Sequence, residues 1–216
     1  LCTFFVRQFG NKRKTLFLFV FLSVCTTFVA MKREILIIMV WCLALLTTSA
    51  QPAGVRLDTL QVKHIDGQGV THTGTIVCNH KITDDLREIF AELYRQRYPI
   101  ERIRPISDYG NDDEQSMRAN NTSCYCYRKV AGSKTLSKHA RGLAIDINPL
   151  YNPCVRRRKD GTLYIQPSTA RRYADRRASF PYKITERDLC YRLFRQHGFV
   201  WGGHWRTVKD YQHFEK

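Results

Sequence analysis

Two apolar runs near the start of the chain limit which part of it can form a folded domain. The first covers residues 15–30, and the second, residues 35–46, follows two basic residues and leads to Thr48-Ser49-Ala50. A basic start, a short apolar stretch and a small-residue exit are the three parts of a secretory signal peptide. We therefore predict that residues 31–50 are a signal peptide and that residues 51–216 fold.

The segment before Met31 has a separate interpretation. The chain begins with Leu1, and a basic and then apolar order restarts at Met31. We expect translation to start there, with residues 1–30 as upstream, non-native translation. The alternative is a hairpin of two membrane helices over residues 15–30 and 35–50. Both runs fall short of the roughly 20 residues that a span needs, which disfavours the hairpin. We predict a periplasmic or extracellular mature protein without a stable membrane span.

The composition indicates a globular, basic protein. Apolar residues make up 44% and aromatic residues 12%, which is enough for a core and excludes a disordered chain. The formal net charge of +16 suggests anionic surroundings such as nucleic acid, lipid or a cell-wall polymer. The chain has no recognisable aromatic and basic nucleic-acid motif, so we predict no nucleic-acid partner.

The cysteines that follow the predicted signal peptide are odd in number, so at least one stays free or pairs between chains. Cys124 and Cys126 lack the second Cys-x-x-Cys that a thiolate zinc site needs. Structural thiols, or a disulfide to Cys154 or Cys190, are expected instead. The full set is Cys78, Cys124, Cys126, Cys154 and Cys190.

Helical and strand patterns follow one another without a regular βαβ alternation. This order predicts an α+β fold, with a small, mainly antiparallel sheet and flanking helices. The second predicted helix carries Asp188 at the third position after Thr185, in the manner of a capping box. The expected elements are strands over 57–62 and 75–78, a helix from Thr83 closed by Pro99, a strand over 100–107, a loop over 109–123, a strand over 143–148, a helix from Thr185 to the stop at Gly198, and an aromatic, strand-like end over 199–216.

The predicted strand over 143–148 carries the first chemically distinctive residues. One set of alternate side chains is apolar and forms a core face, while Asp146 points the other way. Gly142 permits a tight turn, so His139 can fold back towards Asp146. An imidazole beside a carboxylate is a suitable pair of ligands for Zn²⁺.

A second distinctive stretch lies near the C-terminus. Asp210 and His213 are three residues apart, so one turn brings them to a common side. His213 completes a set of two imidazoles and one carboxylate, which leaves a fourth position for water. Asp210 would then act as general base beside that water. His204 is expected to be a structural or rim residue, because three protein ligands already suffice.

Both stretches together resemble a known family. Ser137-x-His139-x-x-Gly142-x-Ala144-x-Asp146, followed by Trp201-Gly202-Gly203-x-Trp205 and Asp210-x-x-His213, is similar to the zinc D-Ala-D-Ala carboxypeptidase family. That family also includes L-Ala-D-Glu endopeptidases, phage endolysins and vancomycin-resistance dipeptidases. The resemblance extends over about residues 70–216, with both motifs in the family's order.

The resemblance implies a Hedgehog/DD-peptidase-like fold, with residues 51–216 as a single zinc peptidase domain. It implies Zn²⁺ as cofactor, with His139, Asp146 and His213 as metal ligands and Asp210 as catalytic base. The family also has a substrate-facing Arg after a Tyr upstream of the first His. Tyr127-Arg128 is the best match, with Arg118 in reserve. We predict Arg128 as a catalytic and substrate-binding residue and Ser137 as a further substrate-binding residue.

The function implied is a secreted zinc metallopeptidase that hydrolyses peptidoglycan peptides containing D-amino acids. We expect it to be a monomer, and the sequence leaves carboxypeptidase and endopeptidase activity open. The alternative is a non-catalytic, zinc-containing wall-binding module. Asp210 argues against it, because a binding module has no use for a base beside the metal.

Overall fold

The computed structural model describes residues 54–130 and 133–216. The predictions for the upstream segment 1–30 and for the signal peptide 31–50 concern residues outside these ranges. Within the described ranges, no helix is both long enough and apolar enough to cross a membrane.

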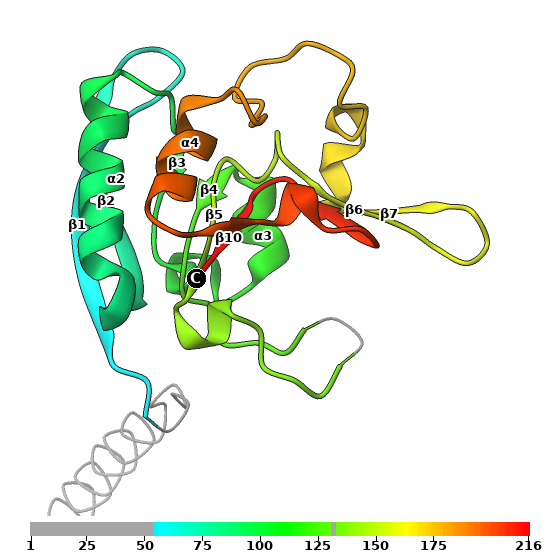
Figure 1. Ribbon diagram of the computed structural model, residues 1–216, viewed down its shortest axis with the longest axis horizontal. Helices are drawn as coiled ribbons and strands as arrows, with labels where there is room; N and C mark the ends of the chain where they lie inside the picture. Colours follow the sequence, from blue (N-terminus) through cyan, green and yellow to red (C-terminus); the bar gives the residue numbers. More distant parts are fainter. Residues whose placement is uncertain (1–53, 131–132) are drawn as a thin grey trace, which may run out of the picture. The chain divides into compact units, whose positions relative to one another are not determined.

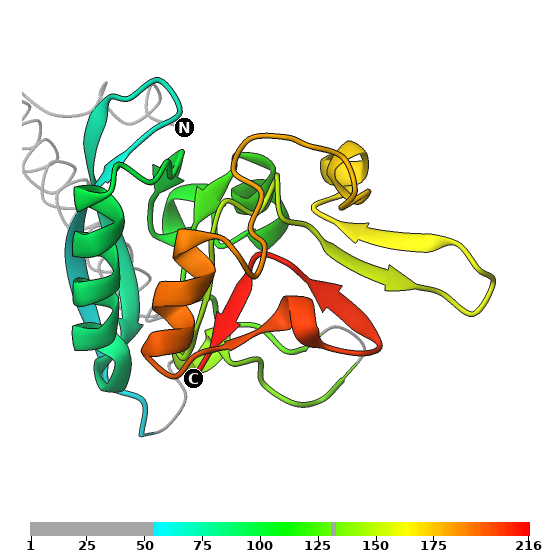
Figure 2. The ribbon, with the colours of Figure 1, turned by 45° about the horizontal axis from the view of Figure 1, so that its top comes forward.

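A long hairpin and a helix form the first layer of the described part. Strands β1 (Leu57–Ile65) and β2 (Thr71–Asn79) pair antiparallel along their whole length, and α2 (Thr83–Arg95) lies along them (Figures 1 and 2). Alternate strand residues are buried beneath the helix, as a half-buried strand requires. The three predicted elements are confirmed, and both strands are longer than predicted. The buried helix stripe consists of Leu86, Ile89, Phe90 and Leu93.

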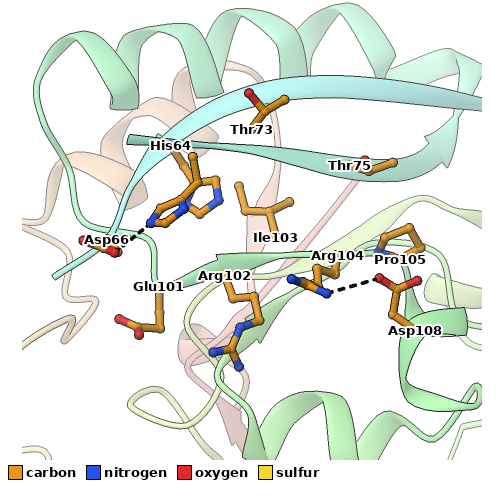
Figure 3. Close-up of a pocket in the computed structure, with 11 residues that line it drawn as sticks. His64, Asp66, Thr73, Thr75, Glu101, Arg102, Ile103, Arg104, Pro105 and Asp108 are labelled. Carbon is orange, nitrogen blue, oxygen red and sulfur yellow. Dashed lines mark hydrogen bonds and ion pairs between the residues drawn. The ribbon is translucent and has the colours of Figure 1, made fainter. Parts of the chain in front are cut away.

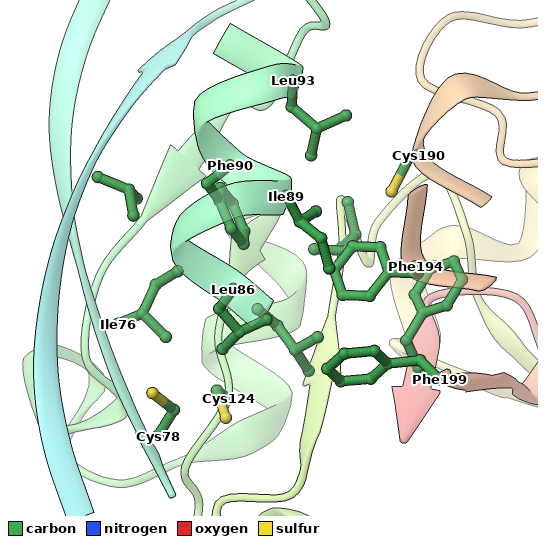
Figure 4. Packing of buried hydrophobic residues seen from close by; sticks show 14 of the residues in the cluster. Ile76, Cys78, Leu86, Ile89, Phe90, Leu93, Cys124, Cys190, Phe194 and Phe199 are labelled. Carbon is green, nitrogen blue, oxygen red and sulfur yellow. The ribbon is translucent and has the colours of Figure 1, made fainter. Parts of the chain in front are cut away.

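The main core lies between this layer and the C-terminal part of the chain. Helix α4 (Leu189–Gln196) packs against α2, and Phe194 and Phe199 face the α2 stripe (Figure 4). The Phe194 ring also stacks on that of Phe214, with centroids 4.4 Å apart. Each such buried ring contributes about 1.5–3 kcal/mol relative to an exposed one. Ile145 joins the same core, so the core holds both the strand that carries Asp146 and the strand that carries His213.

Within residues 54–130 and 133–216, the strands form four small sheets, whereas the sequence predicts one. The sheets pair β1 with β2, β3 with β4, β5 with β10 and β8, and β7 with β6 and β9. Only the β3–β4 pair is parallel among the named strands, so the α+β class and the mainly antiparallel pairing are confirmed. The shorter strands are β3 (Arg102–Ile103), β4 (Asn121–Thr122), β5 (Ala144–Asp146), β6 (Cys154–Arg157), β7 (Leu163–Gln166), β8 (Val200–Trp201), β9 (Val208–Asp210) and β10 (His213–Glu215).

The segment between α2 and the first motif departs most from the prediction. The strand predicted over 100–107 is reduced to β3, because Pro105 offers no backbone N–H and a 3-10 turn, η3 (Ile106–Tyr109), follows it. The loop predicted over 109–123 contains the helix α3 (Asp113–Arg118). The Asp112 carboxylate accepts a hydrogen bond from the Gln115 amide at 3.1 Å, which is an N-cap that the sequence interpretation missed.

The start of the second predicted helix is also wrong. Asp188 is itself the N-cap of α4, because its carboxylate accepts from the Cys190 amide at 2.8 Å. Thr185 instead opens a turn, in which the Asp188 amide donates to the Thr185 carbonyl. The predicted stop is confirmed, since Gly198 has a φ of +81°, a conformation that favours glycine.

The described cysteines all carry free thiols. Cys190 lies in the main core on α4, whereas Cys154 lies on β6 opposite Asp210. The disulfide from Cys124 or Cys126 to either of them is therefore not formed, and the alternative prediction of structural thiols describes the structure.

Candidate metal centre

His139 is positioned by a short turn. It is the first residue of the 3-10 turn η4 (His139–Arg141). The backbone amide of Ala140, in this turn, donates a hydrogen bond to the Ser137 hydroxyl at 3.1 Å. Gly142 follows with a φ of +65°, and a Cβ there would lie 2.6 Å from the Asn79 amide nitrogen. Only glycine therefore lets the chain turn back into β5. The prediction that this turn brings His139 to Asp146 is confirmed, with Nε2 and Oδ1 3.3 Å apart.

Strand register brings the other two residues together. β5 and β10 are antiparallel with His213 directly opposite Asp146, and directly opposite residues project to the same face. The next pair, Ile145 and Phe214, projects into the core. Asp210 ends β9 and His213 begins β10, and a bend at Tyr211 and Gln212 joins the two strands. Both residues lie on a common side, against Gly202, as the spacing predicts.

Three donor atoms converge at this point. His139 Nε2 lies 3.1 Å from His213 Nδ1, and Asp146 Oδ1 lies 3.3 Å and 3.2 Å from these two nitrogens. Ligands placed about 2.0–2.1 Å from a tetrahedral zinc ion are about 3.3 Å from one another. All three residues are buried. The triangle therefore has the size that three ligands of a zinc ion require.

Hydrogen bonds to the far side of each imidazole select the tautomer. His139 Nδ1 donates to the Cys124 carbonyl at 2.7 Å, and His213 Nε2 donates to the Glu215 carboxylate at 3.2 Å. In its neutral form, each ring therefore directs its unprotonated nitrogen to the triangle, where a metal ion would take the place of a proton. Such outer partners are usual for metal-binding histidines. Glu215 is an outer partner that was not predicted, and its signal in the sequence is its place two residues after His213 on the same face of a strand.

The electrostatics of the triangle favour a cation. Burial raises the pKa of Asp146, but the two imidazoles outweigh it and hold that pKa far below its usual range. Burial lowers the pKa of His213, but hydrogen bonds to Asp146 and Glu215 outweigh it and raise the pKa to about 10. The surrounding groups thus stabilise positive charge at the point where the three donors meet.

Asp210 lies next to the triangle with a free oxygen. Its Oδ1 is buried without a hydrogen-bond partner, although the residue as a whole is partly exposed. Burial raises the pKa of Asp210 to about 6, close to the value that suits a general base near neutral pH. Gly202 makes the close approach possible, since a Cβ there would lie 2.9 Å from that of Asp210 and 3.2 Å from that of His213.

Arg128 reaches the same region from the loop before His139. Its Nε lies 2.7 Å from Asp113 Oδ2, as an ion pair that is not aligned as a hydrogen bond. Burial lowers the pKa of Arg128, but Asp113 and Asp146 raise it more, so the net value is raised. Sequence analysis missed Asp113, which occupies the first turn of the unpredicted α3. Arg118, the second candidate for the substrate-facing Arg, donates hydrogen bonds to Glu114 and Ser168 instead.

Three other predicted residues have defined places. The Ser137 hydroxyl caps the η4 turn and is buried, so its contact in the structure is with the chain itself. His204 is exposed and pairs with Glu186, with Nε2 3.1 Å from Oε1, and lies outside the triangle. The partly exposed Trp205 ring lies 5.1 Å from the His213 ring and borders the site.

A polar pocket of about 450 Å³ lies apart from these residues (Figure 3). It is formed by the turn end of the β1–β2 hairpin and the segment around β3. In it, His72 pairs with Asp66, and Arg104 with Asp108. None of the predicted site residues lines it.

Comparison with known proteins agrees with the motifs. Residues 131–216 match the family model described as D-alanyl-D-alanine carboxypeptidase. No curated protein and no solved structure matches the sequence. The resemblance inferred from the motifs is thus confirmed over a range that holds the metal triangle and Asp210, while Asp113 and Arg128 precede it. The Hedgehog/DD-peptidase-like fold stays a prediction.

Proposed function

We propose that this chain, whose C-terminal part matches the D-alanyl-D-alanine carboxypeptidase family model, is an exported zinc metallopeptidase that hydrolyses peptidoglycan stem peptides. One observation carries the proposal: three potential ligand atoms, on His139, Asp146 and His213, converge beside the unpartnered carboxylate oxygen of Asp210. A hydrogen-bonded pair of His139 and Asp146 with only a structural role would not need the His213 nitrogen to face that of His139.

His139 Nε2, Asp146 Oδ1 and His213 Nδ1 would hold the zinc ion. Two imidazoles and a carboxylate that leave a position open are a ligand set of catalytic zinc. Bound there, zinc would lower the pKa of water in the open position towards 7 and polarise the peptide carbonyl. The Cys124 carbonyl and Glu215 keep both imidazoles in the tautomers that this requires.

Asp210 moves the proton. Its free Oδ1 accepts a proton from the attacking water and then returns it to the amine that leaves. The raised pKa of Asp210, about 6, is close to that of the activated water, so the proton can be taken up and released at little cost near neutral pH. Arg128, whose charge is secured by Asp113, stabilises the negative charge that develops on the carbonyl oxygen.

The predicted export and the basic charge support the choice of substrate. The segment 31–50 has the order of a signal peptide that would be cleaved near Gln51, and residues 51–216 keep a large excess of Lys and Arg over Asp and Glu, which suits an anionic wall. The protein would act in the periplasm or outside the cell. N-terminal sequencing of secreted protein tests this part, and an intact segment 31–50 in the mature protein would contradict it.

Digestion of purified muropeptides tests the activity and its type. The secreted protein is incubated with zinc, and the products are weighed by mass spectrometry. Free D-Ala indicates a carboxypeptidase, whereas cleavage between L-Ala and D-Glu indicates an endopeptidase. A chelator should abolish either activity and added zinc restore it. Zinc-loaded protein that binds the wall without cleaving any peptide would favour the non-catalytic wall-binding module.

A further inference from the structure

The three-stranded sheet β7–β6–β9 connects Asp210 to a row of basic side chains. Cys154 of β6 lies opposite Asp210 of β9, and two residues further along β6, Arg156 lies opposite Tyr164 of β7. Opposite residues and alternate residues of a sheet share one face. Arg158 lies two residues after Arg156 and therefore on the same face. The pairing of the two chains continues to this point, because the Arg158 amide donates to the Thr162 carbonyl just beyond the end of β6. Asp210, Arg156, Arg158 and Tyr164 therefore belong to one face.

The other face of this sheet is already covered. Val155 and Ile165, which alternate with the basic residues, pack against Ala170 and Tyr173 of the 3-10 turn η5 (Ser168–Tyr173). Beyond β9, the β6–β7 hairpin extends away from the remainder of the described chain (Figures 1 and 2). The face shared with Asp210 is the one left for a ligand.

The two exposed arginines stack on one aromatic ring and form no direct ion pair within the described residues. Their guanidinium carbons lie 5.1 Å (Arg156) and 5.5 Å (Arg158) from the centre of the Tyr164 ring. Stacking on an aromatic ring holds the plane of a guanidinium while leaving its N–H edges free. Among the ion pairs of the described residues, none includes Arg156 or Arg158. These free donors suit a carboxylate, which a guanidinium binds through two parallel hydrogen bonds.

The spacing relates this cluster to the reaction site. Arg156 lies one strand away from Asp210 and two residues along, or about 8 Å between Cα atoms. An extended peptide covers this distance in about two or three residues. We propose that Arg156 and Arg158 form a subsite for a free carboxylate of the substrate peptide, two or three residues from the bond that is cleaved. This inference rests on the proposed peptidase function.

Paired substrates separate this subsite from general effects. One peptide carries the carboxylate at the proposed position, and the other carries a carboxamide there. For the double variant Arg156→Gln/Arg158→Gln, we expect kcat/KM on the carboxylate peptide to fall about 10-fold or more, mainly through KM, since hydrogen bonds between charged groups are lost. The carboxamide peptide should be cleaved equally by both proteins, and zinc content should not change.

Arg177→Gln is the matched control, because Arg177 is exposed in the neighbouring basic segment and pairs with Asp175. It should leave both peptides unaffected. The Arg156→Lys/Arg158→Lys variant keeps the positive charges but loses the planar guanidinium groups that bind a carboxylate through two hydrogen bonds. On the carboxylate peptide, its kcat/KM should lie between those of the Gln variant and the wild-type protein.

Each other outcome has a distinct meaning. If the wild-type protein cleaves neither peptide, the proposed function fails. If it cleaves both and the double variant loses activity equally on the two, the arginines do not recognise the carboxylate and the subsite is refuted. Unchanged peptide kinetics with weaker binding to phosphate-rich wall polymer would likewise overturn the subsite and assign the face to the polymer.

Discussion

The hairpin–helix layer, residues 57–95, and the candidate metal centre, His139, Asp146 and His213, are built in opposite ways. The layer uses two nine-residue strands and a thirteen-residue helix with regular apolar spacing. The centre uses strands β5 and β10 of three residues each, together with a 3-10 turn. Long elements bury a continuous apolar stripe, whereas each short strand places one residue in the core and the next in the site.

This contrast explains how such short strands hold a precise triangle. Ile145 and Phe214 are fully buried directly beside Asp146 and His213. The core therefore fixes the strands that carry the site. The imidazoles are oriented by the hydrogen bonds that they donate to the Cys124 carbonyl and the Glu215 carboxylate. The buried residues of the layer and the core stabilise the fold. The residues that alternate with core residues along β5 and β10 form the candidate site.

The largest effect should follow from removing the carboxylate of the triangle. Asp146→Asn keeps the size but loses the charge that faces two imidazoles, so we expect the protein to lose zinc on dialysis. Hydrolysis should fall at least as far as the ~10²–10⁴-fold that a general base contributes. Metal analysis and muropeptide digestion measure both.

Asp58→Asn provides the control from the layer, where Asp58 pairs with His80 at 2.8 Å. Zinc content and activity should not change in this variant. Equal zinc loss in the two variants would mean that the triangle is not the metal site.

Asp210→Asn should give the next largest effect. The amide keeps shape and hydrogen-bonding capacity but cannot accept the proton, so kcat should fall about 10²–10⁴-fold while zinc remains bound. Steady-state kinetics together with metal analysis tests this. Loss of zinc along with activity would make Asp210 a ligand or its support, and unchanged kcat would remove it from the mechanism.

A cavity in the layer should affect stability without affecting the metal. Leu93 is buried in the last part of the α2 stripe, and Leu93→Ala should reduce the free energy of unfolding by about 2–5 kcal/mol. Urea unfolding measures this loss. Zinc affinity and kcat of the folded protein should stay at wild-type values, and a marked fall in either would show that layer and centre are coupled.

The smallest effect concerns the outer partner of His213. Glu215→Gln removes the charge that holds the His213 Nε2 proton, and outer-partner substitutions typically weaken metal binding about 10–100-fold. Competition with a chelating dye measures zinc affinity directly. Glu186→Gln is the matched control, since Glu186 pairs with the exposed His204 outside the triangle. Equal affinities in both variants would contradict a role for Glu215.

Periodicity predicted the layer and failed for the short elements. The spacing of apolar residues after Thr83 is a long, repeated signal, so α2 was predicted. The segment 109–123 has no such repeat, and α3 depends on a single cap at Asp112. Thr185 and Asp188 both resemble N-caps, and only packing of Cys190 and Phe194 into the core decides that the helix starts after Asp188.

The residue types of the candidate site and their order can be predicted from the two motifs. These motifs carry the candidate ligands, the neighbouring carboxylate and the glycines that turns and close approaches require. The contacts between the motifs depend on how the chain folds. Opposite register of β5 and β10 brings Asp146 to His213, and α3 brings Asp113 to Arg128. Glu215 and the Arg156–Tyr164 face likewise depend on strand pairing. Contacts between residues far apart in the chain arise from packing and register, which local patterns do not encode.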